Sequence, residues 1–558
     1  MPNPFMMFKM TKPHSVALCF PPHWYYTAVP ADLVYTGAFL QTQGVAVKAL
    51  DLSAGLLHHH LRNVVGYQAL MRRETYLSAA TYAQAGAQVE QALVDVSQRY
   101  RCEYRFSALQ FPDVDETHVP SALRIGLSLS RNPALPVLSR AVSELMSDEP
   151  LLVAVALVHP DQWVPTLAFG RLLRAAGYQG FLCVYGAHED VLSPEDLLDD
   201  LAPTPGQPLH LFFADFDGAI IGEAETALYQ LFLALTQRQA LTGVPSLLAP
   251  KHGVPTVAGR GREKLRSLSR PDYSLVTPSI YPFPAPLPDM RLSRGCPWNR
   301  CAFCAITTHQ QGYRALPASE VVPDLVNAHT QLGASFFRFR DDLLTPKQLL
   351  ALSLAVSRLS FPIRFSVRCR FEKDLTAAVL QTAKAAGLEE LWLGLESAVP
   401  RVRDRMRKGV EQAVIERILR EADQAHIRVR ALCLLGFPGE TAAERRATLD
   451  FLVDNQHRLA SCSLTPFLLM RRSPVGQDPA AFGVTVVPDP RPAHERVCLT
   501  QKAQYEDAPT REEIEALTTE AIERLGARFL HTCAGPTLEH AMMYHSVQQN
   551  GWPGPSTA

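Results

Sequence analysis

Three of the chain's eleven cysteines stand close together, in the stretch LSRGCPWNRCAFCAI from 292 to 306. They are Cys296, Cys301 and Cys304. Thiolates crowded into one loop repel one another unless a cation is shared between them, so the spacing predicts a metal centre. One candidate is zinc, with His309 completing a closed Cys3His site. The other is an iron–sulfur cluster, in which three thiolates leave one iron open to a further ligand.

The other eight cysteines are dispersed, mostly in apolar contexts such as ALCLL and GFLCV. Such isolated thiols are typical small core residues. Cys369, in SVRCRFE, and Cys533, in HTCAGP, are candidates to face a cavity, but core packing is the favoured interpretation for both. The spacing alone therefore singles out the loop at 296–304.

The loop follows an expected β-strand, and a series of βα units continues after it. The expected strands are MRLSRG (290–295), SFFRFRDD (335–342), IRFSVRCR (363–370), ELWLGLES (390–397), IRVRALCLLGF (427–437) and a possible sixth, SCSLTPFLLM (461–470). Five or six such units predict a partial (β/α)6 TIM-like barrel. Barrel enzymes place their chemistry at the carboxyl ends of the strands, which is where the cysteine loop falls.

The N-terminal part predicts a second parallel sheet. Apolar strands at 15–20, 45–53, 151–158, 180–187 and 218–221 alternate with helices, which indicates a doubly wound, Rossmann-like sheet covered on both faces. Ligands bind such sheets beyond the carboxyl ends of the strands. The candidate binding residues there are His159, Gly186, His188, Gly222 and Glu223, with a loop at 21–30.

The fold class is therefore α/β, with four expected parts. They are a Rossmann-like domain at 1–240, a Pro-, Gly- and Arg-rich linker at 241–287, the barrel at 288–480 and a C-terminal helical extension at 481–558. Lys plus Arg (54) nearly balances Asp plus Glu (55), which argues against nucleic acid or a charged membrane surface as a partner. The apolar run at 149–160 is far shorter than a membrane span. We expect a cytoplasmic protein, in which thiols stay available for metals.

The order of motifs resembles the radical S-adenosylmethionine (SAM) superfamily. The cysteine triplet is followed by FFRFRDDLLTP (336–346), by the stretch RFEKDLTAAVLQTAKAAGLEELWLGLES (370–397), by RMRKGV, and by VRALCLLGFPGET (429–441). These matches lie in order over about 150 residues, which a zinc-binding ribbon would not carry. One departure is the spacing of four residues, PWNR, between the first two cysteines, where the family usually has three.

The resemblance implies cofactors and site residues. Three cysteines hold a [4Fe–4S] cluster, SAM chelates the fourth iron, and an electron from the cluster cleaves SAM to a 5′-deoxyadenosyl radical. Glu396, with Ser397 beside it, is then placed to accept hydrogen bonds from the ribose, although a helix-capping role also fits Glu396. Phe303 is placed near the adenine, and Gly436 allows close approach of the backbone. Arg370 either counters the SAM carboxylate or pairs with Asp341 or Asp342.

An α/β domain ahead of such a barrel resembles the subclass with a cobalamin (B12)-binding domain. The Asp-x-His-x-x-Gly motif that supplies a histidine to cobalt in many cobalamin proteins is absent. We expect His159 and His188, taken as the histidines at the strand ends, to bond corrin amides or a neighbouring loop. The resemblance implies a cobalamin-dependent methyltransferase acting on an unactivated carbon of a peptide or small molecule. It also implies an external one-electron reductant of the flavodoxin or ferredoxin type. A cobalamin-free radical rearrangement, cyclisation or redox enzyme is the alternative; no general acid or base is identified.

Overall fold

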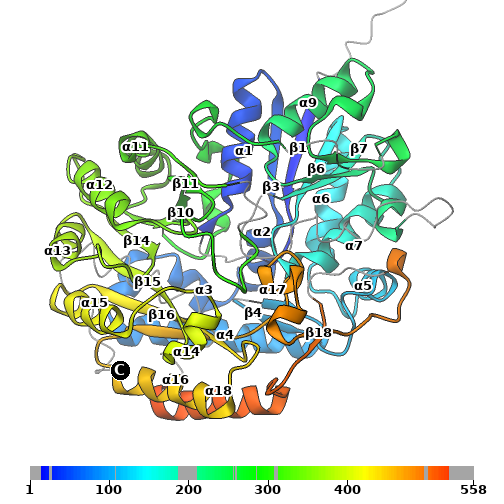
Figure 1. Ribbon diagram of the computed structural model, residues 1–558. Coiled ribbons are helices and arrows are strands. Elements are labelled where there is room, and N and C mark those ends of the chain that lie inside the picture. Colours follow the sequence, from blue (N-terminus) through cyan, green and yellow to red (C-terminus); the bar gives the residue numbers. More distant parts are fainter. Residues whose placement is uncertain are drawn as a thin grey trace, which may run out of the picture.

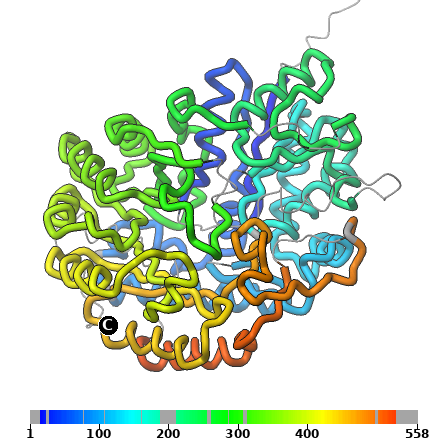
Figure 2. The backbone as a smooth tube through the Cα atoms, in the orientation of Figure 1, coloured from blue at the N-terminus to red at the C-terminus, as the bar shows by residue number. Residues whose placement is uncertain are grey.

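The structure is a computed structural model of the chain. It describes residues 14–23, 28–106, 108–186, 210–254, 257, 261–284, 286–306, 312–495 and 501–526. Two parallel sheets with their helices lie side by side, one coloured blue to cyan and the other green to yellow in Figure 1. Figure 2 follows the same path as a tube, from the blue N-terminal half to the orange C-terminal segments. Among the described helices, none combines the length and apolar character needed to cross a bilayer.

The N-terminal sheet has six strands in the order β3-β1-β6-β7-β8-β9. All neighbours are parallel except β8 and β9. The strands are β1 (Ser15–Phe20), β3 (Ala46–Asp51), β6 (Leu152–Ala156), β7 (Phe181–Gly186), β8 (Gly218–Ile221) and β9 (Leu247–Leu248). The first five confirm the predicted doubly wound sheet. The sixth strand falls in the stretch that was expected to be linker, where Pro-rich composition hides two apolar residues.

Helices cover both faces of this sheet because successive side chains of a strand point to opposite faces. Val16, Leu18 and Phe20 of β1 belong to one apolar core, which they share with α1 (Ala31–Thr42) and α9 (Glu225–Thr236). The alternate β1 residues pack into a second core with α2 (Leu52–Leu61), α6 (Leu135–Asp148) and α7 (Trp163–Ala175). The strand order is that of the flavodoxin-like fold, whose ligand crevice lies where the order reverses, here between β1 and β6.

The barrel sheet has seven strands in the order β17-β16-β15-β14-β13-β10-β2, all parallel. Six of them belong to the predicted βα series, which confirms the partial barrel. They are β10 (Leu287–Met290), β13 (Phe336–Phe339), β14 (Arg364–Cys369), β15 (Leu388–Glu396), β16 (Arg428–Leu435) and β17 (Ser461–Pro466). The sheet remains open, because β17 and β2 end it without pairing to each other.

Two details of this sheet differ from the expectation. The stretch 290–295 is not one strand: β10 ends at its first residue, and the short β11 (Ser293–Arg294) pairs antiparallel with β12 (Arg314–Ala315). The edge strand β2 (Ala28–Val29) comes from the N-terminal part, within the stretch expected to be a loop. Between β1 and β3 the chain therefore leaves the N-terminal sheet, pairs at the edge of the barrel sheet through β2, and returns through α1.

Helices form the outer layer of the barrel, along the left side and the bottom of Figure 1. They are α11 (Val322–Leu332), α12 (Pro346–Val356), α13 (Ala377–Ala385), α15 (Gln412–Gln424) and α16 (Ala442–Asp454). On α15, Val414, Ile415, Ile418, Leu419 and Ala422 are buried, which is the spacing of one apolar helix face.

The C-terminal extension contacts both halves of the molecule. Its helix α18 (Arg511–Leu525) lies against α16, where Arg446 is 2.6 Å from Glu520 and Arg524 is 2.7 Å from Asp450. Upstream of that helix, Arg491 lies 2.6 Å from Asp115 of the N-terminal part. The extension therefore bridges the two sheets at positions far apart in the sequence.

Candidate active site

The cysteine loop leaves β11 through a tightly specified turn. The Leu292 N–H and the Ser293 hydroxyl both donate to one carboxylate oxygen of Asp341, at 3.0 and 2.5 Å. Asp341 follows β13 and is fully buried, which raises its pKa to about 6. At Gly295 the backbone is left-handed (φ 85°), and a Cβ would lie 3.0 Å from the Gly312 carbonyl oxygen. The first barrel strand, the second strand and a glycine thus set where the loop begins.

The three thiols lie half-buried at the carboxyl end of the barrel sheet. Burial raises the pKa of Cys301 and of Cys304, since a thiolate is poorly solvated there. The positive charges of Lys408 and Arg370 act in the opposite direction on Cys301 and stabilise its thiolate. Cys296 and Cys301 both raise the pKa of Cys304, which places the three thiols within electrostatic reach of one another.

The donor set is three thiols, a ligand type that both an iron–sulfur cluster and a zinc ion take. In the described part of the chain, no three His, Cys, Asp or Glu side chains converge as ligands of one metal ion. Thiolates of an iron–sulfur cluster need not converge on one point, because each binds a different iron. His309, the fourth ligand of the zinc alternative, lies outside the described residues.

A buried ion pair stands beside these thiols. Lys408 Nζ lies 2.6 Å from Glu396 Oε1, and the two side chains are 7% and 12% exposed. Glu396 ends β15 with a left-handed backbone (φ 61°), an uncommon conformation for a residue with a side chain. A Cβ at Gly394 would lie 2.5 Å from Glu396 Oε1 and 2.6 Å from Lys408 Nζ, so a larger residue at this strand position would displace the ends of both side chains. The strand end is thus shaped around the pair.

Arg370 and Trp298 connect the cysteine loop to β14. The Arg370 guanidinium lies 3.7 Å from the centre of the Trp298 ring, a cation–π contact, and it donates to the Lys408 carbonyl oxygen. It also lies 3.5 Å from Glu372 Oε1. Of the two predicted roles, pairing with Asp341 or Asp342 is not seen: among the described residues, the ion pair of Arg370 is with Glu372. A role toward the SAM carboxylate stays a prediction.

Ser397 and Phe303 make structural contacts. The Ser397 Oγ accepts from the Val399 N–H at 3.2 Å and lies 3.2 Å from Thr448 Oγ1. The serine therefore caps the turn that leads into α14 (Pro400–Arg405). Phe303 is half-buried against a small apolar cluster that includes Met406. Contacts of either residue with SAM stay predictions.

Gly436 has both its backbone groups engaged. Its N–H donates to Glu440 Oε2 at 2.5 Å, and its carbonyl oxygen accepts from the Tyr505 hydroxyl at 2.7 Å. The backbone is left-handed (φ 78°), and a Cβ would lie 2.6 Å from Pro509 Cγ. The close approach that requires glycine here is therefore that of the C-terminal extension, and contact with SAM stays a prediction.

The predicted strand-end residues of the N-terminal sheet come together only in part. Gln162 joins the loops after β1 and β6: its Oε1 accepts from the His159 N–H at 3.0 Å, and its side-chain amide donates to the Pro21 carbonyl at 2.9 Å. The His159 ring accepts from the Asp161 N–H at 3.3 Å. This arrangement confirms that the loops after the first two strands of the crevice converge, as the doubly wound fold requires.

The strand end after β8 offers open space. Gly186 ends β7 and pairs with Ile221 of β8. Gly222 follows with a left-handed backbone (φ 88°), and, its chain neighbours aside, no atom of the described residues lies within 4 Å of where its Cβ would be. His188 lies outside the described residues.

Glu223 is occupied by ion pairs across the seam between the two sheets. It pairs with Arg314 of β12 and lies 3.5 Å from Arg294 of β11. It also accepts from the Glu263 N–H at 2.5 Å. Glu225, at the start of α9, pairs with the same Arg294, and both side chains are buried. Glu223 therefore has a structural role, which its position after a strand does not reveal. Its contact with a ligand stays a prediction.

Several residues of the site were missed by sequence reasoning. Lys408 lies in RMRKGV, a stretch that was matched as a whole without a role for the lysine. Trp298 lies in the unusual spacer PWNR, where its size was a usable signal. His23 follows β1 and is almost fully buried, which lowers its pKa to about 3, with help from the nearby charge of His159. His159 and His188 are therefore not the only histidines at the strand ends, since His23 lies in the stretch 21–30, which the sequence predicts as a loop.

Comparison with known proteins identifies the barrel. Residues 290–452 match the model of the Radical SAM superfamily. An uncharacterized methyltransferase of Pyrococcus horikoshii is 26% identical over 241 residues, which are 42% of this chain and 52% of that protein. The matched region thus spans about half the length of this relative.

Two solved structures share the two-sheet architecture. The cobalamin-dependent S-adenosylmethionine radical enzyme OxsB, with aqua-cobalamin and S-adenosylmethionine bound, has a TM-score of 0.62 at 11% identity, covering 93% of this chain and 67% of that one. The radical S-adenosylmethionine methyltransferase TsrM of Kitasatospora setae, with tryptophan and a SAM analogue bound, has a TM-score of 0.60 at 14% identity, covering 94% and 92%. At these identities the likeness is one of fold, and it extends over both sheets.

Proposed function

We propose that this chain, in which residues 290–452 form a radical SAM domain, is an enzyme that cleaves SAM reductively at a [4Fe–4S] cluster bound by Cys296, Cys301 and Cys304. The observation that carries the proposal is the position of the thiols. They occupy the loop after the first barrel strand, beside the buried Lys408–Glu396 pair. This is the carboxyl end of the sheet, where barrel enzymes have their active sites. When bound, the cluster supplies one electron to the SAM sulfonium and a corrin supplies a transferable methyl group.

The protein's part is to orient SAM and to balance charge. Lys408 occupies one oxygen of Glu396 and holds the carboxylate in place, so that the other oxygen can accept from a ribose hydroxyl. The buried positive charges of Lys408 and Arg370 offset the negative charge of three thiolates. Trp298 stacks against Arg370 and helps to hold that guanidinium in place.

We further propose that the N-terminal sheet holds cobalamin at its carboxyl edge. The support is the flavodoxin-like strand order, the joined loops after β1 and β6, and the open space at Gly222. OxsB and TsrM, each solved with cobalamin bound, share this fold. Methyl transfer to an unactivated carbon of a peptide or small molecule is then the favoured reaction, with an external one-electron reductant, in the cytoplasm. A cobalamin-free radical reaction is the second candidate, favoured by the ion pairs that Glu223 already makes.

Anaerobic reconstitution tests both levels of the proposal. Iron and sulfide are loaded into the full chain, and 5′-deoxyadenosine is measured after adding SAM and dithionite. Cluster absorbance together with 5′-deoxyadenosine formation is the expected result. Zinc retention without iron and without SAM cleavage would contradict the proposal at its base.

Corrin binding is tested separately with hydroxocobalamin and gel filtration. Near-stoichiometric corrin is expected with the wild type and loss of corrin with Gly222→Trp, whose side chain fills the open space. Gly177→Trp is the matched control, because Gly177 follows α7, is also left-handed, and has no atom of the described part of the chain within 4 Å of its Cβ position, its chain neighbours aside. Gly186→Trp is a poorer test, since that residue is buried within the sheet. If the folded, cluster-loaded wild type retains no corrin, the cobalamin-free reaction takes the place of methyl transfer.

A further inference from the structure

An open hollow of about 600 Å³ lies in the surface beside the cysteine loop. The spacer residues 298–300, between the first two cysteines, form one wall. Asp404, Arg407 and Gly409, which follow α14 or end it, form the other. No role assigned above uses the surface that this hollow presents to solvent.

Trp298 holds the two walls together. Its Nε1 donates to the Arg407 carbonyl oxygen at 3.2 Å. Gly409 has a left-handed backbone (φ 62°), and a Cβ there would lie 2.7 Å from two carbons of the indole, so the ring packs against the glycine backbone. Asn299 is also left-handed (φ 51°), and after this turn the Arg300 guanidinium lies 5.1 Å from the centre of the Trp298 ring. The shape of the hollow is therefore set by direct contacts between its walls.

Each wall is one residue away from the thiols or from the buried charge beside them. On the first wall, the exposed Arg300 is followed directly by Cys301. On the second wall, the exposed Arg407 is followed by Lys408, whose side chain is only 7% exposed and whose charge stabilises the Cys301 thiolate. The outer surface and the thiols are thus separated by a single layer of chain.

This layer is tightly packed. Ala302 and Met406 are both fully buried, and the Ala302 N–H donates to the Met406 carbonyl oxygen at 2.9 Å. The Ala302 carbonyl oxygen accepts from the Val475 N–H at 3.0 Å. A substrate bound in the hollow would be separated from the thiols by this layer. An electron needs no opening, and the rate of its transfer falls steeply with distance, so a thin packed layer suits electron transfer.

The rim of the hollow is basic. Arg300, Arg405 and Arg407 are exposed, with one exposed acidic residue, Asp404, between them in the sequence. Arg405 donates to the Phe482 carbonyl oxygen at 2.8 Å, and the Arg407 guanidinium lies 5.2 Å from the centre of the Phe482 ring, so these two arginines are neighbours. Among the described residues, none of the three arginines forms an ion pair. Three positive charges against one negative charge attract an acidic surface.

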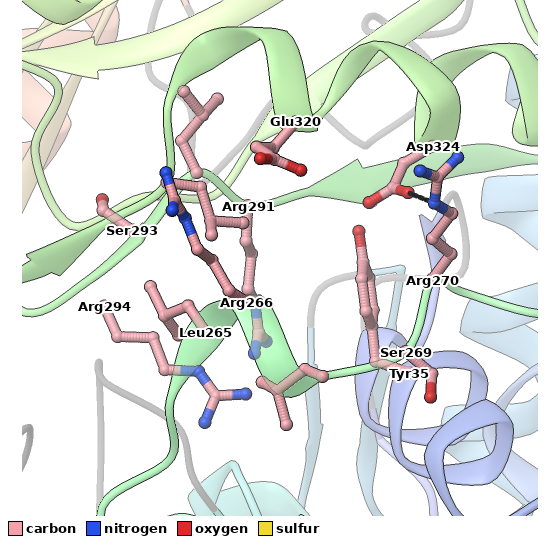
Figure 3. Close-up of a pocket in the computed structure, with 13 residues that line it drawn as sticks. Tyr35, Leu265, Arg266, Ser269, Arg270, Arg291, Ser293, Arg294, Glu320 and Asp324 are labelled. Atoms are coloured by element: carbon pink, nitrogen blue, oxygen red, sulfur yellow. Dashed lines mark ion pairs between the residues drawn. The ribbon is translucent and has the colours of Figure 1, made fainter. Parts of the chain in front are cut away.

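The charges of a second cavity, of about 170 Å³, are arranged differently. It is lined by Tyr35 of α1 and by Arg294 of β11, among others, and is drawn in Figure 3. There the dashed line joins Arg270 to Asp324, whose charged atoms are 3.9 Å apart, and Arg294 pairs with Glu225. Positive charges in that cavity are thus matched within the chain, whereas the three arginines at the rim of the hollow are available to a partner.

We propose that the hollow beside Trp298 is the docking surface for an acidic one-electron carrier protein of the flavodoxin or ferredoxin type, whose carboxylates pair with Arg300 and Arg407. The inference rests on the proposed function, because the electron is destined for the cluster. The reduced carrier loses one electron and the cluster gains it, so no bond breaks and no proton need move. A peptide substrate does not fit this surface, since the packed layer would keep it from the reacting groups.

Binding of a purified acidic flavodoxin to the full, cluster-loaded chain tests the surface, measured by anaerobic calorimetry at low and high salt. One flavodoxin is expected per chain, with an affinity that falls as salt rises. Arg300→Glu combined with Arg407→Glu should bind about tenfold or more weaker. Arg124→Glu combined with Arg420→Glu is the matched control, because these arginines are exposed on α5 (Val119–Gly126) and α15 and the change in charge is the same. Equal binding of the two double variants, or no binding by the wild type, would overturn the proposal.

SAM cleavage with two reductants separates docking from chemistry. Dithionite is a small molecule that needs no docking surface. The variant with Arg300→Glu and Arg407→Glu should therefore form 5′-deoxyadenosine at the wild-type rate with dithionite, but about tenfold or more slowly with reduced flavodoxin. An equal loss with both reductants would overturn the proposal, because the arginines would then act on the SAM site. If even the wild type fails to cleave SAM with dithionite, the proposed function is wrong, and the binding comparison still decides whether the carrier docks here.

Discussion

The barrel mouth and the carboxyl edge of the N-terminal sheet are built from the same parallel βα units but use their charged residues differently. At the barrel mouth, Lys408, Glu396 and Arg370 gather around the thiols and face inward. At the N-terminal edge, Glu223 and its neighbour Glu225 face Arg294 and Arg314 of the barrel and hold the two sheets together. The first region is arranged for chemistry within itself, and the second also serves as a joint.

The difference shows how far a strand end can be interpreted. Both regions lie where parallel sheets bind ligands. Only the barrel mouth adds residues whose chemistry is specific, namely three thiols in one loop. A carboxylate at a strand end, such as Glu223, is equally suited to a ligand or to an arginine of the adjoining sheet.

The largest effect is expected from the thiols. Cys301→Ala removes one of three thiolates and should abolish iron binding and SAM cleavage, while circular dichroism shows the fold retained. Cys102→Ala is the control: this half-buried thiol of the N-terminal part should be dispensable. Full iron and sulfide content with SAM turnover in the Cys301 variant would mean that the ligand assignment is wrong.

The buried pair beside the thiols should give the next largest effect. Lys408→Met leaves Glu396 buried without its cation, and the free energy of unfolding should fall by about 3–5 kcal/mol. Urea unfolding measures this, and Lys408→Met combined with Glu396→Gln should recover most of the loss. Lys373→Met is the control, because its pair with Glu411 is 73% and 66% exposed and contributes little. Equal losses in Lys408→Met and Lys373→Met would contradict the picture of an inward-facing mouth.

Much of the fold was predictable because it follows from local patterns. Apolar strands alternating with helices fixed both parallel sheets, and the cysteine spacing fixed the position of the site. β2 was not predicted, because a strand of two residues shows no periodicity. These residues form a strand only by pairing with β10. β9 was not predicted for the same reason: Leu247 and Leu248 form a strand only by pairing with β8.

The contacts within the site were less predictable. Lys408 reaches Glu396 across twelve positions of sequence, through a turn whose geometry no pattern specifies. The left-handed backbone of Glu396 likewise depends on its surroundings. Ion pairs such as Glu223 with Arg294 join residues about seventy positions apart, and tertiary packing alone selects them.

A smaller, pH-dependent effect should come from Glu440, whose carboxylate accepts from Gly436 at the edge of the mouth. Burial raises its pKa to about 7, whereas an unfolded glutamate has a pKa of about 4.3. The folded state therefore holds the extra proton between these values, and stability falls as pH rises from about 4.3 to 7. Glu440→Gln cannot ionise, so from pH 5 to pH 8 it should gain about 2–3 kcal/mol relative to the wild type.

Thermal or urea unfolding at several pH values measures this difference. Glu444→Gln gives the opposite sign, because hydrogen bonds from Arg401 lower the pKa of Glu444 to about 2. Its stabilising contribution is present above about pH 4.3 and is lost as pH falls toward 2. A pH-independent difference between Glu440→Gln and the wild type would show that the carboxyl group is hydrated, and that the C-terminal extension does not seal this edge.

The smallest effect should come from the contact between the C-terminal extension and the N-terminal part of the chain. Arg491 of the extension lies 2.6 Å from Asp115 and donates to the Thr117 hydroxyl at 3.1 Å. Its side chain is 24% exposed and that of Asp115 is 53% exposed, so Arg491→Gln should cost only about 0.5–1 kcal/mol, and less at high salt. Hydrogen exchange in the extension measures this local loss, with Arg511→Gln on the exposed face of α18 as the control. Faster exchange in Arg491→Gln alone would place the attachment of the extension at Asp115. Unchanged exchange would mean that the extension is held by its contacts with Gly436 and α16. The extension would then belong to the barrel mouth and not to the N-terminal part.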